Sequence, residues 1–197
     1  MNKQTFLNRF LFHNRCDIAK RHVHKNPFNL NQKTLKKAAV LLPLIERQNG
    51  LNILFTERAL HLRHHPGQIS FPGGRYEQSD FSLLHTALRE TEEEIGILQC
   101  QVDIFGSLPE LPTISGFVVS PFLGFVNSDH NIQIDQQEVR GVFEVPLPYL
   151  LDPQHFYKHH LLANRKRHFT YCIPYQNRLI WGATAQMLKN LQEHLAV

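Results

Sequence analysis

The stretch FPGGRYEQSDFSLLHTALRETEEEIGI, residues 71–97, gives the strongest indication of the fold in this chain of 197 residues. The glycine pair Gly73-Gly74 precedes a segment whose apolar residues recur at helical spacing. Asp80 is a candidate N-cap for this helix, and Gly96 stands where a glycine would end it. We therefore predict a glycine turn followed by an amphipathic helix over about residues 80–94.

Three carboxylates of this predicted helix fall within one turn. Glu90, Glu93 and Glu94 are related as i, i+3 and i+4, and Arg89 lies beside Glu93. Like charges at these spacings destabilise an exposed helix by about 0.2–0.5 kcal/mol per pair. A solvent-exposed acidic face is the ordinary interpretation of such a cluster. The glycine turn and the lack of a cation one turn further favour a site for Mg²⁺ or Mn²⁺, which prefer oxygen ligands.

The same residues resemble the Nudix box, G-x5-E-x7-R-E-U-x-E-E-x-G-U, in which U is aliphatic. The matching positions are Gly74, Arg89, Glu90, Glu93, Glu94, Gly96 and Ile97. Two departures are visible. Asp80 replaces the first glutamate and is followed by eight residues before Arg89 instead of seven, and Thr91 occupies an aliphatic position.

The residues just upstream resemble the additional signature of the coenzyme A pyrophosphatase branch of Nudix hydrolases, L-L-T-x-R-[SA]-x3-R-x3-G-x3-F-P-G-G. It matches from Leu54 to Gly74 with Phe55 as the one departure, and members of this branch tend to carry the lengthened, Asp-containing box. The resemblance implies an α/β/α sandwich around a mixed β-sheet. It also implies Mg²⁺- or Mn²⁺-dependent hydrolysis of the diphosphate of coenzyme A or an acyl-CoA.

The resemblance further assigns roles within the box. Glu90, Glu93 and Glu94 would be the metal ligands, and Arg89 would orient them through a salt bridge. Glu93 is the first candidate for the general base, with Glu138 and Glu110 as alternatives outside the helix.

Residues upstream of the helix are assigned to substrate binding. Gly73 and Gly74 would let the backbone approach the metal and the phosphates. Arg58 and Arg63 are candidates for holding phosphate groups, because a guanidinium binds phosphate in a bidentate way. The alternative for both arginines is a surface salt bridge to Glu57.

The rest of the chain predicts a mixed α/β domain over residues 38–197, preceded by a basic helical extension over residues 1–37. The expected strands are 38–46, 51–57, 102–107, 117–126, 139–145, 169–173 and 178–181, with a hairpin turn at 48–50 and a second helix at 183–195. Residues 1–37 hold nine Lys or Arg and one acid, Asp17. The apolar spacing in this extension predicts a helix that ends near Asn26-Pro27 and packs on the domain, in preference to an arm that faces nucleic acid or lipid.

Composition restricts the classes of function. The formal net charge is +4, a mild value that suits an anionic small molecule but does not indicate nucleic acid. The three cysteines form no C-x-x-C pair, and the thirteen histidines form no zinc motif. The densest apolar run, residues 38–45, is shorter than the roughly 18 residues of a membrane helix. We expect a cytoplasmic protein without a membrane segment, and the oligomeric state stays open, with a homodimer among the options.

Two alternatives to a coenzyme A diphosphatase remain at this point. One keeps the catalytic helix and changes the substrate to ADP-ribose or another nucleoside diphosphate derivative. The other is a non-catalytic Nudix-fold binding module that contacts RNA or protein through its basic N-terminal region.

Overall fold

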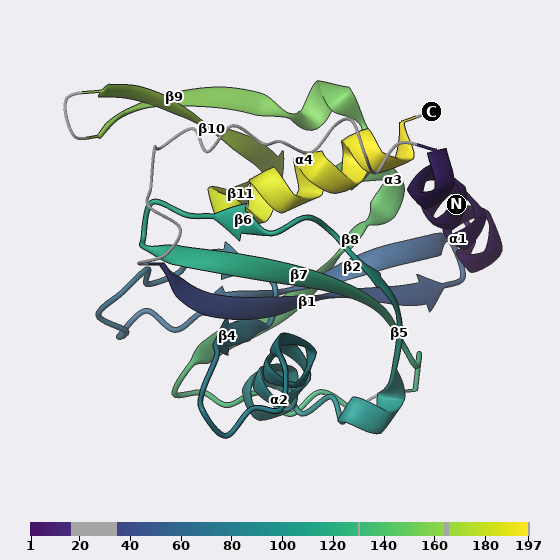
Figure 1. Ribbon diagram of the computed structural model, residues 1–197, viewed down its shortest axis with the longest axis horizontal. Helices are drawn as coiled ribbons and strands as arrows, with labels where there is room; N and C mark the ends of the chain where they lie inside the picture. Colours follow the sequence, from purple (N-terminus) through teal and green to yellow (C-terminus); the bar gives the residue numbers. More distant parts are fainter. Residues whose placement is uncertain (17–34, 130, 164–165, 197) are drawn as a thin grey trace.

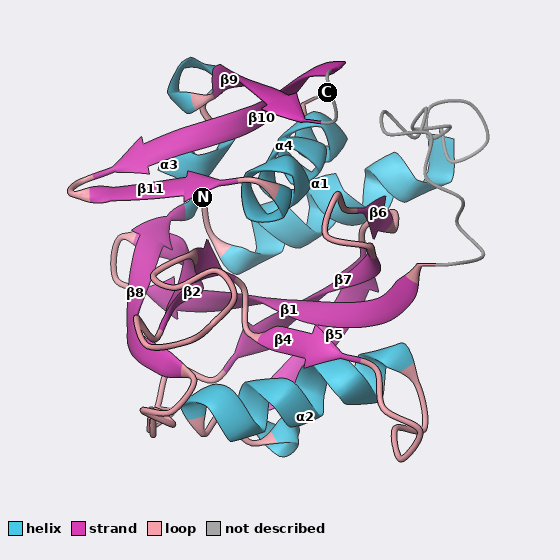
Figure 2. Cartoon of the chain, turned by 90° about the vertical axis from the view of Figure 1, so that its left-hand side faces the viewer, coloured by secondary structure: helices cyan, strands magenta, loops and turns pink. Residues whose placement is uncertain are grey.

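A computed structural model describes residues 1–16, 35–129, 131–163 and 166–196 of the chain. It shows a large mixed sheet with a helix on one face, and a small sheet with further helices on the other (Figures 1 and 2). In this described part of the chain, no helix is long and apolar enough to span a membrane. The α/β architecture around a mixed sheet that the sequence predicted is confirmed.

The elements follow one another along the chain in two sheets. The large sheet holds β1 (Lys36–Arg47), β2 (Gly50–Arg58), β3 (Ile69–Ser70), β4 (Gly73–Arg75), β5 (Val102–Ser107), β6 (Leu111–Pro112), β7 (Phe117–Val126) and β8 (Val139–Pro146). The small sheet holds β9 (Tyr157–Ala163), β10 (Lys166–Tyr175) and β11 (Arg178–Trp181). The helices are α1 (Lys3–Cys16), α2 (Leu83–Ile95), α3 (Leu147–Leu151) and α4 (Ala183–Leu195), with 3₁₀ turns η2 (Gln99–Gln101) and η3 (Pro153–His155).

The centre of the large sheet is β1, which pairs antiparallel with β2 and parallel with β7. Its run of apolar residues from Leu41 to Ile45 is nearly continuous because both faces of the strand are covered. The predicted turn at 48–50 joins β1 to β2, with Arg47 opposite Gly50. Near its start, β1 also pairs with β4, which brings the glycine turn to the middle of the sheet.

The seven strands expected from the sequence are all present, each with bounds shifted by a few residues at most. The sequence patterns missed β9, the short helix α3 and the two 3₁₀ turns, and they missed the short strands β3, β4 and β6. Short strands of this kind hold too few residues to show a period. They form because their backbone groups complete the hydrogen bonding of longer neighbours.

Both predicted apolar helices pack against the sheets. The face of α4 that carries Met187, Leu188, Leu191 and Leu195 is buried in the main core. Trp181, just before this helix, is 37% exposed. In β11 the neighbouring Ile180 faces inward, so the alternation of a strand turns Trp181 outward.

The helix expected near the N-terminus is present as α1, and it packs on the body of the protein. Phe6 and Phe10 have no exposed surface and belong to the same core as β7 and α4. Their rings pack edge-on against the ring of Phe105 in β5. The expected continuation toward Asn26-Pro27 lies outside the described residues.

Candidate active site

The glycine turn and the acidic helix meet because β4 is a strand of the large sheet. Gly74 lies opposite Ala39 of β1, and a Cβ atom on Gly74 would overlap the carboxylate of Glu90. Gly73 has a φ of 147°, and a Cβ atom there would overlap the backbone of β1. Both glycines are therefore required by close approach, one to the helix and one to the neighbouring strand.

The carboxylate of Glu94 is buried beneath this turn. The residue is 4% exposed, and the backbone N–H of Gly73 donates to its Oε2 at 3.2 Å. Burial raises the pKa of Glu94 to about 8, and the negative charges of Glu90 and Glu138 act in the same direction. The hydrogen bond from Gly73 and the positive charge of Arg58 oppose this shift.

Glu90 lies one turn earlier on α2 and is mostly buried. Desolvation raises the pKa of Glu90, and Arg89 opposes the shift, while the charges of Glu93 and Glu138 add to it. Glu90, Glu94 and Glu138 thus interact electrostatically although they come from a helix and from the loop before β8. Of these three, Glu138 is the exposed one.

Arg89 holds the acidic residues in place. Its guanidinium donates to Asp80 Oδ1 at 2.9 Å, to Glu90 Oε1 at 2.9 Å and to Glu93 Oε2 at 2.7 Å. The sequence has no cation one helical turn after the glutamates. Arg89, which precedes them, supplies the positive charge instead. The salt bridges expected for Arg89 are present, and its role in orienting the cluster stays a prediction.

Asp80 is not the N-cap of α2, as the sequence suggested. The cap is Ser82, whose Oγ accepts from the His85 backbone N–H at 3.1 Å. Asp80 is instead buried, and it accepts hydrogen bonds from the side chains of Arg89, Thr86 and His85. These donors, with Arg89 foremost, hold the pKa of Asp80 well below its usual range. The other end of α2 is as predicted, with Gly96 in the left-handed conformation at φ 74°.

Thr91, the polar residue at an aliphatic position of the box, is fully buried. Its Oγ1 donates to the carbonyl of Ala87 at 2.6 Å, one turn earlier in the helix. The hydroxyl is therefore satisfied within the helix itself, and the position keeps its buried character.

The remaining predicted site residues differ in their positions and surroundings. Arg58 ends β2 and acts electrostatically on Glu94, whereas Arg63 is exposed in the loop between β2 and β3. Glu93 keeps 59% of its side chain exposed beside Arg89. Glu110 accepts from Ser120 Oγ at 2.9 Å and lines a separate hollow with Leu83, at the start of α2.

The salt bridge proposed as the alternative for Arg58 and Arg63 is not formed. Glu57 contacts Arg140 at 3.0 Å and Arg178 at 4.0 Å, and both of these arginines come from the far part of the chain. Within the described residues, neither Arg58 nor Arg63 makes a salt bridge. Sequence analysis missed this pairing because it joins β2 to β8 and β11.

The acidic cluster offers carboxylate oxygens to a cation. Among the described residues, the structure has no group of three or more His, Cys, Asp or Glu side chains placed to hold a metal ion. The chemistry of the donor set nevertheless fits Mg²⁺ or Mn²⁺, because Glu94 is buried, Glu90 is mostly buried, and desolvation raises the pKa of both carboxyl groups. A hard divalent cation would favour the ionised form of both groups.

Comparison with known proteins gives a family match. The NUDIX domain family matches residues 35–170. The "Uncharacterized Nudix hydrolase NudL" of Yersinia pestis (strain Pestoides F) is 38% identical over 164 residues, which cover 83% of this chain and 82% of that protein. The protein of the same name from Yersinia pseudotuberculosis (serotype O:1b, strain IP 31758) matches to the same extent.

The fold also has a counterpart among solved structures. The NUDIX domain of Shewanella oneidensis NrtR, solved as a complex with ADP ribose, aligns with a TM-score of 0.52 at 18% identity. The alignment covers 85% of this chain and 94% of that one. At this identity the likeness concerns the fold alone.

Proposed function

This chain belongs to the Nudix family and is a hydrolase of pyrophosphate bonds, and we propose that its substrate is coenzyme A or an acyl-CoA. The products are then 4′-phosphopantetheine, or its acyl form, and adenosine 3′,5′-bisphosphate. The observation that carries the catalytic part is the buried carboxylate of Glu94 beside Glu90, beneath the Gly73-Gly74 turn. The choice of coenzyme A rests on the signature from Leu54 to Gly74.

The proposed metal ligands are Glu90, Glu93 and Glu94. The Oε2 atom of Glu93 is bonded to Arg89, which leaves the other carboxylate oxygen of Glu93 for a metal ion. When bound, Mg²⁺ or Mn²⁺ neutralises charge on the diphosphate and lowers the pKa of a water molecule. Arg89 is a positioning residue in this scheme, because it contacts the ligands and not the reacting atoms.

The reaction itself is a displacement at phosphorus. A water oxygen forms a bond to one phosphorus atom, the bond from that phosphorus to the bridging oxygen breaks, and the leaving phosphate keeps the electron pair. The water proton passes to a general base. We assign this role to Glu138, because it is exposed and within electrostatic reach of both Glu90 and Glu94, whereas Glu93 is bonded to Arg89 and Glu110 lies by another hollow.

Arg58 and Arg63 are the proposed contacts to the phosphates of the substrate. Arg58 carries a positive charge that acts on Glu94, and no described carboxylate takes it up in a salt bridge. A guanidinium in that position is suited to a phosphate oxygen of the diphosphate. Arg63, exposed in the adjoining loop, is the second proposed phosphate contact.

A substrate panel tests the proposal. Turnover of coenzyme A, ADP-ribose and NADH is measured with Mg²⁺ and with Mn²⁺, and coenzyme A is expected to have the highest kcat/KM. Preference for ADP-ribose would contradict the coenzyme A assignment while keeping the catalytic site. Absence of turnover with every substrate, together with salt-sensitive RNA binding that is lost when residues 1–30 are deleted, would favour the non-catalytic binding module.

A further inference from the structure

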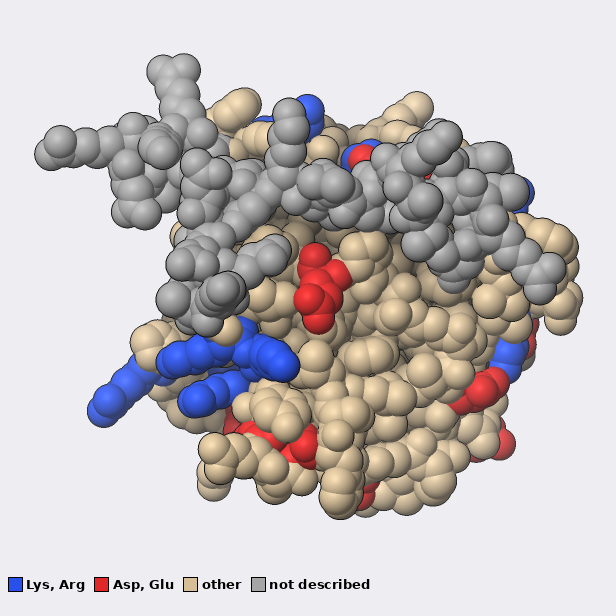
Figure 3. All heavy atoms as spheres, in the orientation of Figure 1, with Lys and Arg blue, Asp and Glu red and all other residues tan. Residues whose placement is uncertain are grey.

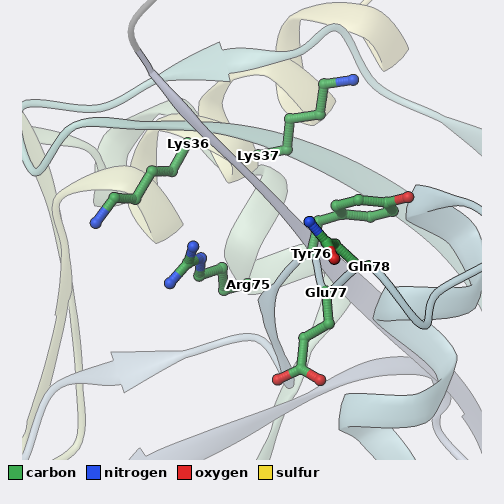
Figure 4. Close-up of a pocket in the computed structure, with 6 residues that line it drawn as sticks. All are labelled: Lys36, Lys37, Arg75, Tyr76, Glu77 and Gln78. Carbon is green, nitrogen blue, oxygen red and sulfur yellow. The ribbon is translucent and has the colours of Figure 1, made fainter.

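A cavity of about 500 Å³ lies beside the glycine turn, where β1 begins and β4 ends. Its lining consists of Lys36, Lys37, Arg75, Tyr76, Glu77 and Gln78 (Figure 4). Three of these six side chains are cations and one is an acid. Figure 3 shows a group of Lys and Arg side chains on one side of the molecule, with acidic side chains below it and another acidic patch above and to its right. None of the residues proposed above as metal ligands, general base or phosphate contacts lines this cavity.

Sheet pairing brings these cations together from two strands. Arg75 lies opposite Ala38, and the Tyr76 backbone N–H donates to the carbonyl of Lys37 at 3.0 Å. The side chains of Lys36 and Arg75 extend to the same side, whereas Lys37 extends to the other side of the strand (Figure 4). In the part of the chain that the structure describes, none of the three is joined to a carboxylate by a salt bridge.

The wall of the cavity is tied to the catalytic helix. The hydroxyl of Tyr76 donates to the carbonyl of Asp80 at 3.2 Å, and the backbone N–H of Glu77 donates to Asp80 Oδ2 at 2.9 Å. Asp80 is the buried residue that also holds Arg89. These hydrogen bonds fix the turn after Arg75 relative to α2. This lowers the entropic cost of ordering the turn when a ligand binds.

The cavity is close to the proposed metal ligands but opposite in charge. Gly74 touches Glu90, and Arg75 is the next residue of the strand, about 3.3 Å further along. Cations in such a cavity repel a metal ion and attract an anion. An anion bound there lies near the diphosphate of a substrate without being the group that the carboxylates and metal hold.

We propose that Lys36 and Arg75 bind a phosphomonoester of the substrate that is separate from its diphosphate. The inference rests on the proposed function, since in coenzyme A this group is the 3′-phosphate of the ribose. A phosphomonoester carries a charge of about −1.5 to −2 at pH 7, which two converging cations match better than one. ADP-ribose and NADH lack this group, so the cavity selects among diphosphate substrates.

The kinetic test compares coenzyme A with 3′-dephospho-coenzyme A. The wild-type KM is expected to be higher for the dephospho form. Lys36→Gln and Arg75→Gln each raise the KM for coenzyme A about tenfold, as expected for loss of one charge-assisted hydrogen bond, so that the KM ratio of the two substrates falls toward one. An unchanged ratio in both variants would overturn the inference.

Lys3→Gln is the matched control for the loss of one positive charge. The backbone of Lys3 bonds to Glu46 near the other end of β1, about 33 Å along the strand from Lys36. It is expected to leave the KM ratio at the wild-type value. A fall in this control equal to that in the two variants would show a general charge effect and contradict a local site.

Binding without turnover separates this inference from the proposed function. In metal-free buffer, calorimetric titration of wild-type protein with adenosine 3′,5′-bisphosphate is expected to give tighter binding than titration with AMP. Arg75→Gln should abolish that preference. If the protein hydrolyses neither form of coenzyme A but shows the preference, the proposed function fails and the anion site stands. If it hydrolyses both forms but shows no preference, the anion site fails.

Discussion

Burial distinguishes the glutamates of α2 at the scale of single residues. Glu94 is 4% exposed, Glu90 is mostly covered, and Glu93 has a largely exposed side chain. Helical spacing placed all three on one arc, but spacing carries no information on what covers each of them. The depth of Glu94 follows from the Gly73 backbone that lies against it. The three carboxylates therefore differ in burial although their sequence positions look equivalent.

The raised pKa of Glu94 gives a pH dependence of stability. Its pKa of about 8 in the folded protein lies above the ordinary value of 4.5, so the folded state holds the proton more tightly. This contribution is complete below pH 4.5 and is lost as the pH rises toward 8. In metal-free buffer we expect Tm to fall between pH 5 and pH 8 by several degrees more in the wild type than in Glu94→Gln. Parallel Tm profiles would contradict the buried, proton-binding state.

A second residue-scale prediction concerns Glu93. Glu93→Gln is expected to lower kcat by orders of magnitude in saturating Mg²⁺, because a proposed metal ligand is lost. In metal-free buffer the free energy of unfolding should change by no more than about 1 kcal/mol, since the ion pair with Arg89 is exposed. Glu92→Gln removes the same charge one residue earlier and is expected to leave kcat within about twofold of the wild type. A marked loss of stability in Glu93→Gln would mean that the residue serves the fold.

At the scale of elements, a single buried carboxylate joins the turn after β4 to α2. Asp80 bonds to the backbone of Glu77 on one side and to Thr86 and Arg89 of the helix on the other. The carboxylate of Asp80 also accepts a hydrogen bond from the ring of His85 in the helix. The turn and the helix thereby form one rigid unit under the sheet.

Asp80→Asn tests this unit. The amide cannot match the charge of Arg89, and breaking a buried ion pair costs about 3–5 kcal/mol of unfolding free energy. Chemical denaturation should show this loss, and kcat should fall because Arg89 no longer fixes Glu90. Asp103→Asn serves as the control, because it removes the same charge from an exposed ion pair. In that pair the Oδ2 atom of Asp103 lies 3.6 Å from the Nζ atom of Lys3. Equal stability of the two variants would show that Asp80 is not an anchor.

At the scale of the whole molecule, the N-terminal helix is part of the core. Phe10 packs on Phe105 of β5 and on His194 of α4, elements that lie about one half and one whole chain length away. The sequence predicted an amphipathic helix here without indicating its partners. Gly106 makes room for the Phe10 ring, a fit that exists only in the folded chain.

Truncation of this ring tests the contribution of α1. Phe10→Ala is expected to lower the free energy of unfolding by about 3–5 kcal/mol, the usual cost of removing a buried aromatic ring. Phe12→Ala removes a ring that is 68% exposed and should have an effect of about 0.5 kcal/mol or less. Both are measured by denaturant titration of the full chain. Equal effects would mean that α1 is dispensable to the fold.

The sequence by itself determined the features that are encoded locally. Periodic apolar residues specified the strands and the two long apolar helices, Gly96 specified the end of α2, and the spacing around Arg89 specified the acidic turn. These features depend on residues within a few positions of one another, so a linear pattern records them.

Only the tertiary structure decided which of these features meet. The pairing of β1 with β4 placed Arg75 beside Lys36 and set Gly74 against Glu90, and the pairing of β2 with β8 brought the region of Arg58 near Glu138. Asp80 is a buried anchor because, in the folded chain, the guanidinium of Arg89 lies against its carboxylate. The physical reason is that strand pairing and burial depend on contacts between residues far apart in the chain, and local periodicity does not specify these contacts.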